Sequence, residues 1–396
     1  MTIGIERLAV YVPGEAVQID TLAAARGARV TAIEGDRAHR AFAVAAPCED
    51  VVTLAATAGA RILRAGGMGR NQVGLLLVAS ATAPSPTRPV ASYVHGLLGL
   101  SPRCRAVDVV AGNLAGTTAV TLAQSWIQAG GFRNRCALVI AADIVRAQPE
   151  TPRELAQGAA AVALVVGLAP QVLILPNDGV SATAGRAGNR QPYRAALTDA
   201  FQAFRHAERP ALEGSEALTD RLAKVLYQAS SPASAIAAHR HVLRVDWQAA
   251  SGRWPETAAE ADAAVASAVG TQVEPWVHVV GQIGNTRAAG IWLALAATVE
   301  AEGRRLGGRR IGLFAFDPAV GGEFCTGLVP SGVVAVADTG LGAGLAGRVW
   351  LSAEQYTARA GRNGGGDPPP GFAGDFVYVT TRRGRRVYVA RASSTI

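Results

Sequence analysis

The chain has 396 residues, of which 49% are hydrophobic and 17% are charged, and this composition excludes a disordered protein. The net charge of +8 comes almost wholly from arginine, because Lys224 is the only lysine. The arginine runs are interrupted and lack interleaved aromatic residues, so the sequence does not indicate nucleic-acid binding.

The four cysteines, Cys48, Cys104, Cys136 and Cys325, are scattered along the chain without a C-x-x-C pair. No histidine stands at ligand spacing from them, so we expect neither a metal site nor a disulfide framework. Unpaired thiols are typical of a reducing cytoplasm. No apolar run reaches membrane-spanning length and the N-terminus has no signal-peptide profile, so we expect a cytoplasmic protein that does not enter a membrane.

In chain order, strand-like apolar runs alternate with alanine-rich helical stretches in the first half. Strands with continuous apolar residues are buried on both faces. The sequence predicts helices near 50–65, 88–99 and 115–129, and strands at 73–79, 137–142 and 161–166.

The second half repeats this plan, and two halves rich in βαβ units predict a layered, internally duplicated α/β fold. We place the halves at residues 1–168 and 169–396, and leave 180–230 unplaced as an expected part of the substrate entrance. The predicted strands are 235–239, 311–316 and 324–329, the long helix is 288–301, the loop is 362–371, and a closing hairpin covers 376–390.

Several segments spread along the chain resemble hydroxymethylglutaryl-CoA synthase, a branch of the thiolase superfamily close to ketoacyl synthase III. These are residues 3–13 (IGIERLAVYVP), 142–146 (ADIVR), 157–164 (QGAAAVAL), 352–356 (SAEQY) and 372–376 (FAGDF). The resemblance implies a five-layered α-β-α-β-α homodimer in the cytoplasm. It also implies acyl thioesters of coenzyme A or of an acyl carrier protein as substrates, and no bound cofactor.

The positions that would carry the family's covalent chemistry are replaced. The nucleophile motif resembles A-C-Y-A-A-T, but residues 112–117 read GNLAGT, so Asn113 stands in place of the cysteine. A carboxamide is a very poor nucleophile, and a thioester on this residue is excluded. Ala81 replaces the general acid/base glutamate that follows V-A-T. Pro318 enters the loop that helps to form the oxyanion hole and lacks a backbone N–H.

Two other segments are similar to ketoacyl synthase III. Residues 239–245 (HRHVLRV) resemble its H-Q-A-N-L-R-I, and residues 284–289 (GNTRAA) resemble its G-N-T-S-A-A. In that branch the paired histidine and asparagine stabilise an enolate, so His239 and Asn285 are predicted to polarise a thioester carbonyl without a nucleophile.

Each candidate residue also has a purely structural interpretation. A histidine at the end of a buried strand is usually a satisfied core residue, so His239 is open to both readings. Asn113 either contacts the substrate or satisfies a tight turn. Asp317 is either a new acid or base or the start of a turn.

Three hypotheses follow for the function. The first is an enzyme that processes an acyl thioester without covalent catalysis, by decarboxylation, acyl transfer or carbon–carbon bond chemistry, in polyketide or other natural-product biosynthesis. The second is a catalytically inactive partner subunit of an active thiolase-like enzyme. The third is a tailoring cyclase or dehydratase. Ordinary hydroxymethylglutaryl-CoA synthesis is not expected, because it uses both the thiol and the carboxylate.

Overall fold

The structure is a computed structural model of the chain. The residues that it describes are 1–27, 38–65, 67–84, 88–131, 135–151, 153–176, 182–184, 192–208, 216–250, 254–331, 339–360 and 365–391.

The first half has the alternation that the sequence predicts. The three expected helices and three expected strands are all present, each within a few residues of its predicted bounds. The elements are β1 (Gly4–Tyr11), β2 (Glu15–Gln18), α1 (Ile19–Arg26), β3 (Ala41–Val44), α2 (Val51–Ala65), β4 (Val73–Ala79), α3 (Val90–Leu97), β5 (Arg105–Val109), α4 (Ala115–Gln128), β6 (Cys136–Val145) and β7 (Gly158–Gly167).

The second half contains more helix than the sequence predicts. The predicted long helix, the two later strands and the closing hairpin are confirmed. The elements are β8 (Leu173–Ile174), β9 (Ala182–Ala184), α5 (Tyr193–Glu208), β10 (Leu222–Tyr227), α6 (Pro232–Ala249), α7 (Ala258–Gln272), α8 (Glu274–Val280), α9 (Gly290–Glu302), β11 (Arg310–Asp317), β12 (Gly321–Leu328), α10 (Leu341–Ala346), β13 (Val349–Trp350), α11 (Ala353–Arg359), β14 (Phe376–Arg382) and β15 (Arg385–Ala390).

The strand predicted at 235–239 is wrong, because these residues lie inside helix α6. Ser231 caps the helix by accepting a hydrogen bond from the Ser234 N–H, and Pro232 occupies the first helical position. This start signal outweighs the short apolar run. The strand of this region is instead β10, inside the segment that the sequence left unplaced.

Strands of both halves join in one ten-stranded mixed sheet. Its order is β10-β11-β12-β8-β1-β7-β6-β4-β5, and β9 pairs with β12. Strand β4 runs parallel to β5 and β6, whereas β7 is antiparallel to both β6 and β1. The short strand β8 connects the two parts by pairing with β1 and β12. The division of the chain at residue 168 stays a prediction.

Helices and sheet alternate in the layers of a thiolase-like α/β fold. Helix α2 packs on β1, β6 and β7. Leu76 and Val78 of β4 belong to the same hydrophobic cluster as the buried residues of α2. Leu75 and Leu77 face the other way, into the core that holds α4 and α9. Helix α9 is buried at every position from Ile291 to Val299, as expected for an inner layer. Helix α5 covers β11 and β12.

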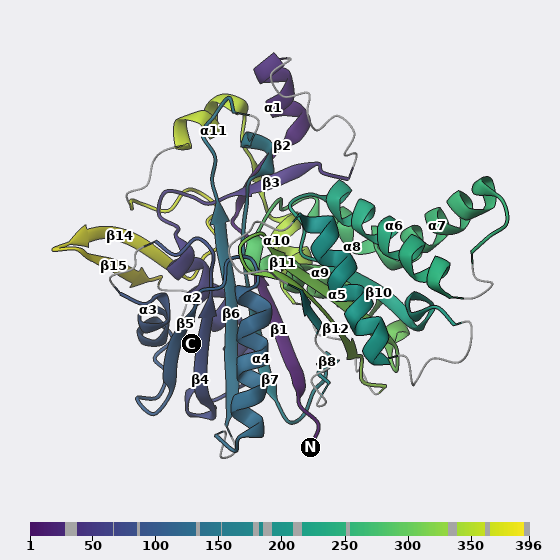
Figure 1. The fold of residues 1–396 in the computed structure, drawn as a ribbon. Helices are drawn as coiled ribbons and strands as arrows, with labels where there is room; N and C mark the ends of the chain where they lie inside the picture. Colours follow the sequence, from purple (N-terminus) through teal and green to yellow (C-terminus); the bar gives the residue numbers. More distant parts are fainter. Residues whose placement is uncertain are drawn as a thin grey trace.

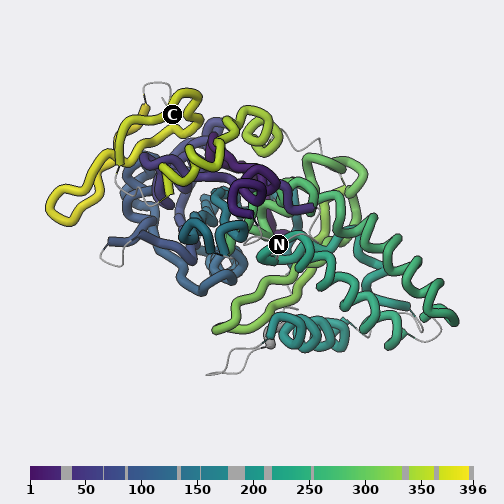
Figure 2. Tube along the Cα trace, turned by 90° about the horizontal axis from the view of Figure 1, so that it is seen from above, coloured from purple at the N-terminus to yellow at the C-terminus, as the bar shows by residue number. Residues whose placement is uncertain are grey.

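The figures place these elements in space. The hairpin of β14 and β15 lies at one end of the molecule, and α6 and α7 lie at the other (Figure 1). The view from above shows the same separation (Figure 2).

Among the described residues, no helix combines the length and the apolar character needed to cross a bilayer.

Candidate acyl-binding pocket

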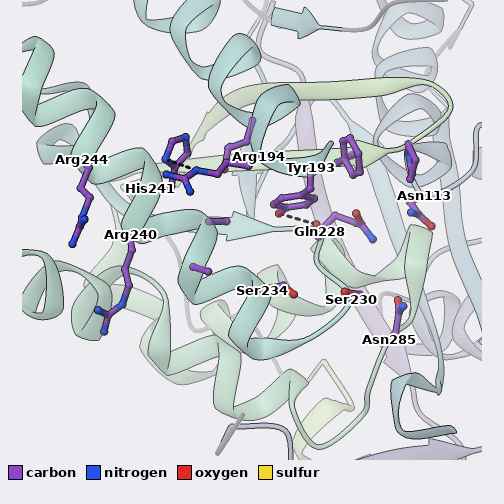
Figure 3. A pocket seen from close by; sticks show the side chains of 15 residues that line it. Asn113, Tyr193, Arg194, Gln228, Ser230, Ser234, Arg240, His241, Arg244 and Asn285 are labelled. Carbon is purple, nitrogen blue, oxygen red and sulfur yellow. Dashed lines mark hydrogen bonds between the residues drawn. The ribbon is translucent and has the colours of Figure 1, made fainter. Parts of the chain in front are cut away.

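A cavity of about 640 Å³ lies between the start of α5, the first turns of α6 and the ends of β10 and β11 (Figure 3). This volume is in the range of small-molecule sites. The turn before α4 and the loop after α8 complete its wall. The lining residues are Asn113, Tyr193, Arg194, Leu197, Gln228, Ser230, Ser234, Ala237, Ala238, Arg240, His241, Arg244, Asn285, Phe316 and Pro318.

Three carboxamides from separate segments line one end of this cavity. Asn113 lies in the turn between β5 and α4, Gln228 directly follows β10, and Asn285 lies between α8 and α9. Figure 3 shows the three side chains on the same side of the pocket, away from the arginines. We call Asn113, Gln228 and Asn285 the amide cluster. An amide donates and accepts hydrogen bonds but has no proton to exchange near neutral pH, so the cluster offers polarity without acid or base chemistry.

Hydrogen bonds to the main chain fix part of this cluster. Asn285 Oδ1 accepts the Arg287 N–H over 3.1 Å, which leaves the amino group of Asn285 as its donor toward a ligand. Asn113 Oδ1 is buried without a hydrogen-bond partner among the described residues. The main chain of Gln228 is held on both sides, because its N–H donates to Phe314 and its carbonyl accepts the Tyr193 hydroxyl. A ligand with a hydrogen-bond donor would satisfy the Asn113 oxygen.

Asp317 lies beside Asn113, but its carboxylate is turned toward main-chain groups. Oδ2 accepts the Asn113 N–H over 3.0 Å, and Oδ1 accepts the Ala319 N–H over 2.9 Å. The second bond is the signature of a side chain that starts a turn. Asp317 therefore has the geometry of the structural alternative, and its role as an acid or base stays a prediction.

His239 does not face the pocket, contrary to expectation. Its side chain is fully buried inside the protein, where Nδ1 accepts the Tyr227 hydroxyl over 3.0 Å and Nε2 donates to Gln272 Oε1 over 2.8 Å. Burial lowers the pKa of His239 to about 4, so the ring is neutral. The structure thus brings Asn113 and Asn285 together and leaves His239 out, because residue 239 is on the inner face of a helix rather than at a strand end.

Basic side chains line the other end of the cavity. Arg194, Arg240 and Arg244 come from α5 and α6 (Figure 3). Arg194 Nε donates to His241 Nδ1 over 3.0 Å, while His241 Nε2 lies 2.7 Å from the Thr198 hydroxyl. Burial and the nearby Arg194 guanidinium lower the pKa of His241, so this ring is a neutral acceptor for the arginine. The site is therefore polarised, with cations at one end and neutral amides at the other.

A buried carboxylate outside the cavity holds the segment that contains Ala81. Asp143 Oδ1 accepts hydrogen bonds from the Ser80 hydroxyl, the Ala81 N–H and the Thr82 hydroxyl. Its other oxygen accepts the Ala288 N–H before α9. Burial nevertheless raises the pKa of Asp143 to about 6. Ala81 itself supplies no titratable group, and it does not line the cavity.

The sequence did not predict three of the lining residues, Gln228, Tyr193 and Arg194. All three lie within residues 180–230, the segment that was left unplaced. The usable signal for Gln228 was its position as the first polar residue after the apolar run that ends at Tyr227. A ligand site at the carboxyl end of a strand is common in α/β proteins.

Among the described residues, no group of three or more His, Cys, Asp or Glu side chains could hold a metal ion.

Comparisons with known proteins agree with this fold. Residues 1–171 match the family described as hydroxymethylglutaryl-coenzyme A synthase, N terminal. The chain superposes on the structure of MvaS in complex with 3-hydroxy-3-methylglutaryl coenzyme A with a TM-score of 0.87. The two are 30% identical, over 98% of this chain and 99% of that one. Such likeness along the whole length defines a thiolase-like protein. The chain belongs to the hydroxymethylglutaryl-CoA synthase family.

Two curated relatives are more distant in sequence. Hydroxymethylglutaryl-CoA synthase of Enterococcus faecalis is 28% identical over 183 residues, which span 46% of this chain and 47% of that protein. The matched region thus covers about half of that relative. PksG of Bacillus subtilis, a polyketide biosynthesis 3-hydroxy-3-methylglutaryl-ACP synthase, is 25% identical over 339 residues, 79% of this chain and 77% of the relative.

Proposed function

We propose that this protein binds an acyl group carried as a thioester and processes it without becoming acylated. The observation that supports this proposal is the amide cluster at the end of the pocket. Asn113, Gln228 and Asn285 are neutral hydrogen-bonding groups, and none is a nucleophile or a general base. Chemistry at this end of the cavity therefore has to proceed by polarisation of the substrate.

Decarboxylation of a malonyl-type thioester is the reaction that such a site supports best. The bond between the carboxylate and the α-carbon breaks, carbon dioxide leaves, and the electron pair moves into the thioester carbonyl to form an enolate. Water then supplies the proton to the α-carbon. The step needs donors to the carbonyl oxygen, as the amino groups of Asn285 and Gln228 provide, and it needs no base. An aldol-type condensation would instead require a base to deprotonate the acetyl group.

An acyl carrier protein is the proposed source of the thioester, with coenzyme A as the alternative. Both carry the acyl group on phosphopantetheine, whose phosphate suits the guanidinium groups of Arg194, Arg240 and Arg244. The name of the Bacillus subtilis relative includes an acyl-carrier substrate and polyketide biosynthesis. We therefore place the reaction in a polyketide or related natural-product pathway.

A homodimer in the cytoplasm is the proposed state of the protein. Among the described strands, β5 ends the sheet order and pairs only with β4, which leaves its other edge for a strand of a second copy. Val107 in β5 is 41% exposed, Val110 just after it is 78% exposed, and Leu122 of α4 is 47% exposed. Large apolar side chains at an open edge favour pairing with a second copy. The four cysteines are free, in agreement with a reducing compartment.

A second candidate function is that of a catalytically inactive partner subunit. The same amide cluster favours it, because loss of acid, base and nucleophile also removes the means of catalysis. An inactive partner would be purified bound to an active homologue, whereas the proposed enzyme would be isolated as a homodimer.

The deciding experiment incubates the purified protein with malonyl- and acetyl-loaded carrier proteins and follows both proteins by intact mass. We expect the malonyl carrier to lose carbon dioxide and this chain to gain no mass. The matched variants Asn285→Ala and Gln228→Ala should each slow the loss by about 100-fold or more, the usual cost of one oxyanion donor. No change on any substrate would favour the inactive partner, and an acyl adduct on the chain would refute the proposal.

A further inference from the structure

The turn that carries Asn113 has a main-chain donor whose partner is a carboxylate of the chain itself. The Asn113 N–H donates to Asp317 Oδ2, although the two residues are far apart in sequence. The next two N–H groups, of Leu114 and Ala115, donate to carbonyls within the same turn. Of these three donors, the Asn113 N–H is the one that a ligand could use, and Asp317 takes it.

The turn that carries Asp317 is closed to ligands in the same way. Pro318 has no N–H. The Ala319 N–H donates to Asp317 Oδ1, and the Val320 N–H donates to the Asp317 carbonyl. Residues 318–320 therefore keep no main-chain donor for a bound molecule. The two oxygens of the carboxylate are held from two sides, which fixes its position against the turn before α4.

The close approach of this carboxylate depends on Gly112. The residue has a φ of +55°, a conformation that favours glycine. A Cβ atom built on it would lie 2.2 Å from Asp317 Oδ2, which is too close for any side chain. The carboxylate thus lies where α4 begins, and a helix N-terminus favours negative charge. The contact between the Asp317 carboxylate and the Asn113 N–H therefore requires glycine at position 112.

We infer that Asp317 is a specificity-determining residue, because its carboxylate occupies the place where an anion would bind to the Asn113 N–H. A negatively charged oxygen or a thiolate at this point meets a fixed negative charge and finds no free donor. This inference deepens the proposed function: the thioester oxygen is polarised by the side chains of Asn285 and Gln228, and the group that contacts the main chain at Asn113 is uncharged.

A thiol placed at residue 113 reports directly on this arrangement. We would compare Asn113→Cys with the double variants Asn113→Cys/Asp317→Asn and Asn113→Cys/Asp317→Ala. Iodoacetamide alkylates the thiolate with loss of iodide, and peptide mapping separates position 113 from the four natural cysteines. Because the Asp317 charge opposes the thiolate, alkylation at pH 7.5 should be at least tenfold faster in both double variants. This arm needs no substrate, so it tests the inference even if the proposed function fails.

Acetyl-CoA provides the second arm. The acetyl group moves from the coenzyme A sulfur to the Cys thiolate introduced at position 113, and coenzyme A leaves as the thiol. Acetylation should be fastest with Asp317→Ala, which frees the main-chain N–H, and slower with Asp317→Asn, which still accepts it. If alkylation responds but no variant is acetylated, the inference stands and the binding of acyl thioesters fails.

Two results would overturn the inference. One is an alkylation rate that stays within twofold in all three variants. The other is a single Asn113→Cys variant that is acetylated as fast as either double variant. Thermal unfolding checks that each variant folds, and Asp317→Asn keeps a turn-forming acceptor should Asp317→Ala fail to fold.

Discussion

The pH dependence of stability around Glu49 is a direct test of the fold. The Glu49 carboxyl is 3% exposed and accepts hydrogen bonds from the Tyr11 hydroxyl and the Ala46 N–H. Burial is the main cause that raises its pKa from 4.5 to about 7, against the opposing effect of these bonds. The folded protein therefore binds this proton more tightly than the unfolded chain. The stability that it contributes is fully present below pH 4.5 and is lost as the pH rises through about 7.

The size of the effect follows from the distance between the two pKa values. A shift of about 2.5 pKa units at about 1.4 kcal/mol per unit is worth about 3.5 kcal/mol in full, of which about 3 kcal/mol is lost between pH 4.5 and pH 8. Glu49→Gln removes the titration, so the stability of wild type relative to this variant should fall by about 3 kcal/mol between pH 4.5 and pH 8. For a chain of 396 residues this corresponds to about 4 °C in melting temperature. The subtraction cancels other buried groups, such as Asp143, that titrate in the same range.

The assay is thermal unfolding of both proteins from pH 5 to pH 8.5. Tyr11→Phe is the matched control, because it removes a donor that stabilises the carboxylate and should move the midpoint to higher pH. Parallel melting curves for wild type and Glu49→Gln across this range would refute the reasoning.

Three further predictions concern the site and its surroundings. His239→Ala leaves the Tyr227 hydroxyl and the Gln272 side-chain carbonyl unpaired in the core, so the free energy of unfolding measured with urea should fall by about 2–3 kcal/mol. Turnover per folded protein should change less than twofold. Arg240→Glu with Arg244→Glu should weaken carrier binding at least tenfold and flatten its salt dependence in calorimetry; unchanged affinity would exclude these arginines from the entrance. Val107→Arg should convert a dimer to a monomer in analytical ultracentrifugation, and an unaltered sedimentation coefficient would remove β5 from the interface.

The sequence predicts the first half well because its signals are unambiguous. Residues 73–79 are continuously apolar and bounded by polar residues, which is typical of a strand covered on both faces, and β4 has these same bounds. The second half mixes signals. Residues 235–238 are apolar and residue 239 is a histidine, so the strand prediction depended on only five residues. The helix start at Ser231 and Pro232 decides the structure.

The candidate site was predictable only where its residues lie in recognisable sequence motifs. Asn113 and Asn285 follow recognisable motifs, and the structure places both in the pocket. The prediction for His239 depended on a short motif read in the wrong secondary structure. Gln228 was missed because a single glutamine after an unrecognised strand has no local signature. The contact between Asp317 and Asn113 joins β11 to the turn before α4, and no local pattern specifies such a long-range pairing.

The most direct test of acyl processing without an acyl-enzyme uses a malonyl carrier protein in deuterated water. Decarboxylation through a polarised enolate predicts an acetyl carrier with deuterium at the methyl group, a homodimer that carries no acyl adduct, and loss of the deuterium signal with Asn285→Ala. An acyl adduct on the protein, or full activity in the Asn285→Ala variant, would contradict the account.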